Sequence, residues 1–202
     1  MKIKNETALP NDLVKRVLES ALKAVSELIP CPNLIGADMF VEVRNGPNHG
    51  VSTGLLYTHD KTMKGCYVET CWAINHRDRK THSSKNYDYA SGLTPDIPNA
   101  LDIYALCAHE FAHNLEDING ICSEPSPGHH SKRPEEIRAR EIERKVLFNL
   151  TEEQWGLLRE LAQACETFGN PDKRKNRYPI LFGKSGYLER KIRQTWIQEE
   201  CR

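Results

Sequence analysis

The sequence lacks several features that would assign a protein to a broad class. The 202-residue chain has no apolar run near the roughly 20 residues that a membrane-spanning helix requires. Its first residues, MKIKNETALPNDL, contain no apolar core of the kind found in signal peptides. Lysine plus arginine and aspartate plus glutamate both number 28, which makes the formal net charge zero. We therefore expect no membrane segment, no signal peptide and no overall electrostatic field that would favour nucleic acid.

Paired cysteines are also missing. The seven cysteines are dispersed and form no CxxC pair, which a zinc ribbon would need. A disulfide framework in a small secreted chain would favour an even number. We interpret these cysteines as reduced thiols and predict a cytoplasmic protein.

The chain contains neither an internal repeat nor a low-complexity tract, and its length fits one domain with a sizeable core. We predict an α+β fold. A small, three- to four-stranded, mostly antiparallel sheet would pack on an N-terminal helix, a second helix and a third helix, with extra helices towards the C-terminus. Residues 1–150 would form the main domain, and residues 151–202 a C-terminal helical extension packed on it.

Apolar spacing predicts the elements of the first half. A helix is expected over residues 12–28, because an apolar stripe recurs there at helical spacing. The segments DMFVEVR, STGLLYTH and GCYVETCWAIN alternate apolar and polar residues as half-buried strands do, and Val68, Trp72 and Ile74 share one face. Residues 76–94 are expected to form a long polar loop. The helix stripe comprises Leu13, Val14, Val17, Leu18, Ala21, Leu22 and Val25.

The second half is predicted to be helical. A second helix over residues 96–117 ends before an Asn-Gly pair, and a third begins at Pro134 with the sequence PEEIRAREIERKVLFNL. A fourth helix starts after Thr151, because Thr151 and Gln154 match the capping box. A short helix is expected after Ser185.

The segment ALCAHEFAHNLED places two histidines and a carboxylate close together on the second helix. His109 and His113 are four residues apart, so they project from the same face and can bind one ion through their ring nitrogens. Glu110 is rotated about 100° from His109, which brings it to the edge of the site, where a general base takes a proton from water. This HExxH spacing predicts a Zn²⁺ ion bound by His109 and His113.

The surroundings of the motif favour a ligand role. The helix is apolar nearly all round and should be buried. Polar groups buried without partners cost several kcal/mol, and a bound metal would compensate for that cost. The apolar positions are Leu106, Cys107, Ala108, Phe111, Ala112 and Leu115.

The same segment resembles the active-site helix of zincin metallopeptidases, and HEFAH has the small and apolar middle residues usual there. The order helix, small sheet, HExxH helix and second ligand helix resembles the minimal gluzincins over roughly residues 12–150. The resemblance implies an enzyme, a zinc metallopeptidase, whose catalytic domain is residues 1–150. The metzincin pattern HExxHxxGxxH is absent, because Glu116 occupies its glycine position and Asn119 its last histidine position.

The third ligand is sought downstream, because a catalytic zinc usually has three protein ligands and one open position. In gluzincins this ligand is a glutamate on a following helix, often in the pattern E-x-x-A. The segment RPEEIRARE offers Glu136, with Ala139 three residues on, and Glu135 beside it. The helix macrodipole also favours acidic residues in a first turn and would explain this pair without a metal. We favour Glu136.

A histidine is the rival third ligand. The segment NGICSEPSPGHHSKRPEEI also resembles the SprT-like families, in which a histidine on the loop after the HExxH helix binds the metal. His130 fits that pattern best, and His129 lies next to it. The zinc ribbon that often follows an SprT-like domain is missing. With Glu136 as the ligand, His130 or His129 would instead stabilise the oxyanion.

The expected reaction is peptide-bond hydrolysis, with Glu110 as general base and His130 as a second catalytic residue. Tyr87 and Tyr89 are further candidates for the donor that stabilises the tetrahedral intermediate. In zincins the edge strand before the active-site helix holds substrate by β-addition, and here that strand would be residues 65–74. Ordinary sheet pairing explains the same strand equally well.

Two other functions stay open at this point. The basic run KRKNR and the later Arg190, Lys191 and Arg193 would suit a DNA-associated, SprT-like protease, although nearby acidic residues also fit a solvated surface helix. A non-catalytic zinc domain would result if His130 joined the other three ligands and closed the coordination. We expect a peptide or protein substrate, rank nucleic acid below it, and expect no membrane partner.

Overall fold

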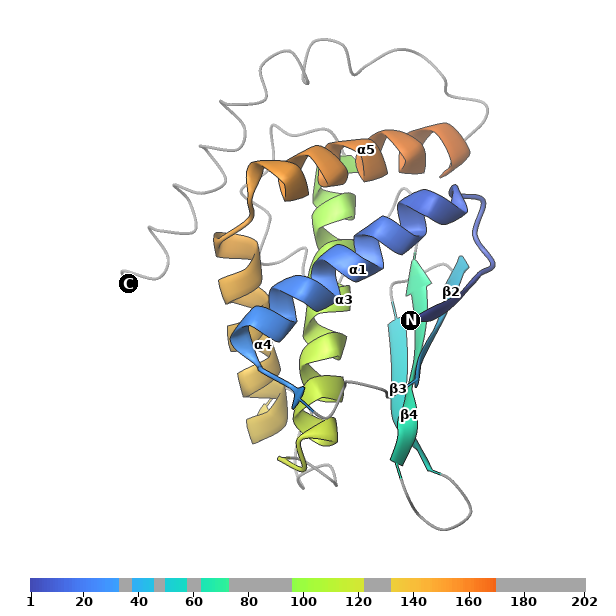
Figure 1. Cartoon of the computed structure of the whole chain (residues 1–202). Helices are drawn as coiled ribbons and strands as arrows, with labels where there is room; N and C mark the ends of the chain where they lie inside the picture. The colour runs from blue at the N-terminus through green and yellow to red at the C-terminus, as the bar shows by residue number, and fades with distance from the viewer. Residues whose placement is uncertain (33–37, 46–49, 58–62, 73–95, 122–131, 170–202) are drawn as a thin grey trace.

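The computed structural model describes residues 1–32, 38–45, 50–57, 63–72, 96–121 and 132–169. Figure 1 shows a small sheet with helices beside it, and the long helix α3 runs through the middle of the helical layer. The elements in chain order are β1 (Lys2–Asn5), α1 (Asn11–Leu28), β2 (Asp38–Asn45), β3 (Gly50–Tyr57), β4 (Met63–Trp72), α3 (Asp96–Ile118), α4 (Pro134–Phe148) and α5 (Glu152–Gly169).

The four strands form one mixed sheet in the order β1-β2-β4-β3. β1 pairs with β2 and β2 with β4 in parallel, whereas β3 pairs with β4 in antiparallel orientation. The α+β class is therefore retained, but the prediction of a mostly antiparallel sheet is wrong. That prediction assumed that neighbouring strands in the sequence pair as hairpins. Instead, α1 carries the chain back from β1 to a parallel β2, and β4 inserts between β2 and β3.

One face of the sheet is apolar and joins the core. On β2, Met39, Val41 and Val43 are buried, and on β4 Val68 and Trp72 are buried, as the alternation predicted. Ile74, expected on the same face, lies outside the described residues. The burial explains why this side of the sheet packs against the helices, since β-strand side chains alternate between faces.

The opposite face of the sheet is held by charged side chains. Lys4 on β1 lies opposite Glu42 on β2 and forms an ion pair of 2.9 Å with it, and Arg44 reaches Glu69 on β4 at 2.9 Å. The hydroxyl of Tyr67 donates to Glu42 at 3.0 Å. These contacts cross from strand to strand, so they reinforce the register that the buried face imposes.

The four helices predicted between residues 12 and 169 are present. α1 begins one residue before the predicted start, and six of the seven apolar stripe positions are buried, with Leu22 half-buried. The capping box before α5 is confirmed: Gln154 Oε1 accepts from the backbone N–H of Thr151 at 2.7 Å, and Thr151 Oγ1 accepts from that of Gln154 at 3.2 Å.

A buried hydroxyl connects three helices. Tyr104 of α3 is fully buried, and its hydroxyl accepts a hydrogen bond from Gln154 of α5 at 3.0 Å. The same oxygen lies 2.9 Å from Ser20 Oγ of α1. α5, the first part of the predicted C-terminal extension, therefore packs on α3 and α1, while the division into two parts stays a prediction.

Several predictions concern residues that are not described. The polar loop over residues 76–94, the short helix after Ser185 and the basic residues near the C-terminus all lie outside the described residues. In the part of the chain that is described, no helix has the length and hydropathy needed to cross a membrane. Among the described residues, Cys31, Cys66, Cys107 and Cys165 form no disulfide.

Candidate metal centre

The HExxH motif lies on α3, the central helix of the fold. Both predicted features of this helix are present: it spans Asp96–Ile118, and its apolar positions are buried on several sides. α3 packs against α1, α4, α5 and the sheet, which leaves only part of its circumference for polar groups. His109, Glu110 and His113 occupy that part and are each half-buried. The neighbouring buried positions are Ala105, Cys107, Ala108, Phe111, Ala112 and Leu115.

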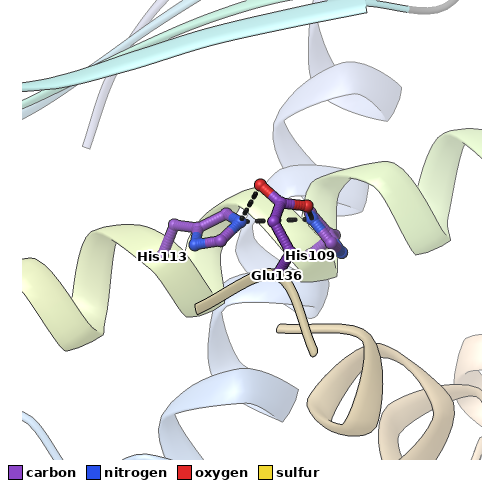
Figure 2. A group of neighbouring side chains, drawn as sticks. All are labelled: His109, His113 and Glu136. Atoms are coloured by element: carbon purple, nitrogen blue, oxygen red, sulfur yellow. Dashed lines mark hydrogen bonds and ion pairs between the residues drawn. The ribbon is translucent and has the colours of Figure 1, made fainter. Parts of the chain in front are cut away.

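Three candidate donors converge between α3 and α4. His109 Nε2 and His113 Nε2 lie 3.2 Å apart. The carboxylate of Glu136, on the first turn of α4, has Oε2 3.4 Å from His109 Nε2 and Oε1 3.5 Å from His113 Nε2. Figure 2 shows the Glu136 side chain rising from α4 so that its carboxylate faces both imidazoles. These three residues form the one group of histidine, cysteine and carboxylate side chains with metal-ligand spacing in the described part of the chain.

The separations fit one tetrahedral ion. Ligand atoms about 2.0–2.1 Å from a zinc in tetrahedral coordination lie about 3.3–3.4 Å from one another. The observed separations are 3.2, 3.4 and 3.5 Å. Two imidazole nitrogens and one carboxylate are also a donor set that catalytic zinc sites use. The residues present therefore fit a zinc ion.

A second carboxylate from α4, which sequence reasoning missed, orients the first histidine. Glu143 Oε2 on α4 lies 3.2 Å from His109 Nδ1. An N–H at Nδ1 donated to this carboxylate leaves Nε2 with its lone pair directed at the centre of the group. The signal was present in the sequence, because Glu143 stands seven residues after Glu136 and hence on the same side of that helix.

The two histidines have different electrostatic environments. For His109, burial lowers the pKa, but the hydrogen bond to Glu143 and the charges of Glu110 and Glu136 outweigh it, so the pKa lies above its ordinary value. For His113, burial and the neighbouring His109 lower the pKa below its ordinary value. His113 is therefore held in the neutral form, which is the form that binds metals.

Glu110 is the acidic residue between the two histidines. Burial raises the pKa of Glu110 to about 7; His109 opposes this shift, and the charges of Glu136 and Glu143 add to it. Its backbone carbonyl accepts a hydrogen bond from Asn114 Nδ2 at 2.9 Å. A carboxyl group with a pKa near neutrality suits exchange of a proton with a substrate or with water.

An ion pair between α3 and α4 holds the two halves of the site together. Glu116 is buried, and both its oxygens accept from the guanidinium of Arg138, at 3.0 and 3.2 Å. Arg140 Nη2 lies 3.6 Å from Glu136 Oε2, on the rim of the group. The Glu116–Arg138 pair fixes the start of α4 beside the His113 turn of α3, which determines where Glu136 lies.

The structure distinguishes among the other predicted site residues. Glu135 is buried but is not a member of the three-residue group, and the small Ala139 is fully buried, as the E-x-x-A pattern implied. His129, His130, Tyr87 and Tyr89 lie outside the described residues.

The expectation that residues 65–74 form an edge strand is wrong, because β4 pairs on both sides and the edge strand beside it is β3.

No protein-family model, curated protein or solved structure matches the chain. The class of the protein is therefore defined by its own fold and site. It is a two-layer α+β protein whose central helix and the following helix bring two histidines and a glutamate together in metal-ligand geometry.

Proposed function

We propose that the protein is a zinc-dependent metallopeptidase. The observation that carries the proposal is the convergence of His109, His113 and Glu136 at separations of 3.2 to 3.5 Å, with Glu110 between the histidines in the sequence. Three protein ligands are the number that a catalytic zinc site uses, because the fourth position is reserved for water or substrate.

Three side chains of this protein would bind the zinc ion. His109 and His113 would hold the ion through Nε2, and Glu136 through its carboxylate, while Glu143 keeps the His109 ring in the tautomer that exposes Nε2. Zinc in such a site lowers the pKa of water towards about 7 and polarises the carbonyl of the bond to be cleaved.

Glu110 supplies the acid–base step. Its carboxylate accepts the proton of the attacking water and afterwards delivers that proton to the leaving amine. Burial raises the pKa of Glu110, and the charge of a bound zinc ion would lower it again, so that the carboxylate form that accepts the proton would be present at neutral pH.

The sheet offers a place for the peptide backbone. β3 is the last strand of the sheet, and α3 packs against it. In the described ranges no strand pairs with the outer edge of β3, so an extended peptide could add there as a further strand. The strand proposed to hold the peptide is thus β3 and not β4, because the backbone of β4 already pairs on both sides.

The test combines zinc analysis with hydrolysis of a fluorogenic peptide library. Wild-type protein should bind one zinc ion per chain. Glu136→Ala and His113→Ala should lose it, whereas His130→Ala should retain it. Glu110→Gln should keep the zinc and lose roughly 10²–10⁴-fold in hydrolysis rate. A protein that takes up no zinc, or a Glu110→Gln variant as active as wild type, would contradict the proposal.

A further inference from the structure

A row of arginines runs along α4 beside the metal centre. Ile137, Arg140 and Arg144 are spaced at i, i+3 and i+7 and so share one side of α4, and Arg133 is the N-cap residue immediately before the helix. Arg144 is exposed, Ile137 is 46% exposed, and the Arg140 side chain is 33% exposed. We call Arg133, Arg140 and Arg144 the arginine stripe.

The arginine stripe borders the three-residue group. Arg140 reaches Glu136 Oε2 at 3.6 Å, and Glu136 and Glu143 lie on the adjacent side of the same helix. Arg138 does not belong to the stripe, because its guanidinium faces the other way and pairs with the buried Glu116. Arg140 therefore contacts the group directly, and the α3–α4 ion pair uses a different arginine.

We propose that the arginine stripe binds an acidic segment of the peptide substrate next to the metal centre. Arg133 and Arg144 are eleven residues apart, about 16 Å along a helix, which matches about five residues of extended peptide. Guanidinium groups bind carboxylates through two parallel N–H donors, and five donors per group allow an existing ion pair to be kept. The exposed Ile137 offers an apolar contact within the same row.

Acidic peptide fits this surface better than nucleic acid does. A phosphate backbone would pass close to Glu136 and Glu143 and to the exposed Glu141 of the same helix. Nucleic-acid binding that depends on phosphate contacts gains affinity from many cations, whereas this stripe has three and the whole chain has no net charge. A short peptide can place its few carboxylates on the arginines and avoid the glutamates.

This inference rests on the proposed function for the position of the site, but its test measures binding. Two fluorescent peptides of equal length would be titrated by anisotropy into zinc-loaded Glu110→Gln protein, one with four acidic residues and one with glutamine in their place. The acidic peptide should bind at least tenfold more tightly. Adding Arg133→Gln with Arg144→Gln should reduce that ratio to below threefold and leave the affinity for the neutral peptide unchanged.

The matched control removes the same charge elsewhere. Lys23→Gln with Lys145→Gln, on α1 and on another side of α4, should change either affinity less than twofold. Equal binding of the two peptides, a loss in the control as large as in the stripe variant, or stronger binding of an oligonucleotide than of the acidic peptide would overturn the inference. Absence of zinc and of hydrolysis in wild type would contradict the proposed function alone, because the peptides can also be titrated without metal.

Discussion

At the scale of single residues, the candidate centre depends on how His109 is held. Its Nδ1 faces Glu143 at 3.2 Å and its Nε2 faces His113 and Glu136. The hydrogen bond from Nδ1 fixes one tautomer of the ring, in which Nε2 is available to a metal. We therefore predict that Glu143 is a positioning residue, which would act on the metal through His109.

Replacing Glu143 tests that role. Glu143→Ala should weaken zinc binding by about 10–100-fold, because the ring loses its acceptor, and Glu143→Gln should lose less because its amide oxygen can still accept from Nδ1–H. Competition against a fluorescent chelator measures the affinity. The control is Glu141→Gln on an exposed position of the same helix. Unchanged zinc affinity in Glu143→Ala would contradict the role.

A second residue-scale prediction concerns pH. Burial and the charge of Glu116 raise the pKa of Asp117 from about 3.8 to about 6. The folded state then binds the proton more tightly than the unfolded state does. The free energy of unfolding therefore falls as the pH rises from 3.8 to 6, and above pH 6 the whole of this destabilisation by Asp117 is present.

Asp117→Asn should remove that cost. Because Asp117 is only half-buried, solvent screening reduces the expected gain at pH 7 to about 1 kcal/mol. At pH 3.5 the variant and the wild type should have nearly equal stability, since the carboxyl group is largely protonated in both states. Urea unfolding at the two pH values measures this, and a gain of equal size at pH 3.5 would contradict the assignment to Asp117.

At the scale of elements, the site depends on the docking of α4 against α3. Glu116 is 6% exposed, and Arg138 is its bidentate partner. Removing one member leaves the other as a buried charge without compensation, which is more costly than loss of an exposed pair.

Arg138→Ala should therefore destabilise the protein by about 2 kcal/mol, less than for a fully buried pair because Arg138 is partly exposed. Arg16→Ala, which breaks an exposed pair with Glu160 between α1 and α5, should cost less. Adding Glu116→Gln to Arg138→Ala should recover part of the loss. Chemical denaturation of the four proteins measures these differences, and equal losses for Arg138→Ala and Arg16→Ala would contradict the argument.

At the scale of the whole molecule, zinc should bind the folded chain and not the unfolded one. The candidate ligands lie on two helices, 136 − 113 = 23 residues apart in sequence, and come together through the packing of α3 and α4. Zinc at about 1,000 times its dissociation constant should therefore add about 4 kcal/mol of stability, and EDTA should reverse it. Thermal unfolding with and without zinc measures the gain, which should be absent in Glu136→Ala.

The spacing of apolar residues along the sequence was sufficient to predict most of the helices and strands. The helical spacing of Leu13, Val17 and Ala21 and the strand alternation around Val41 and Val68 depend on neighbouring residues only, and the structure has these side chains buried. The HExxH pairing of His109 and His113 is local in the same sense, because four residues on a helix fix their relative positions.

Tertiary packing decided the strand directions and the side-chain contacts between distant segments, which the local sequence pattern left open. The sequence determined where the described helices and the strands β2, β3 and β4 form and which two imidazoles share a helix face, because those properties follow from residues a few positions apart. The direction of β4 beside β2, the strand β1 in a polar segment, and the meeting of Glu136 and Glu143 with His109 depended on contacts between distant segments. Such contacts form only when the helices and the sheet bury their apolar faces together. The sequence therefore left Glu136 and His130 as rival third donors, and the folded chain brings Glu136 and Glu143 to His109.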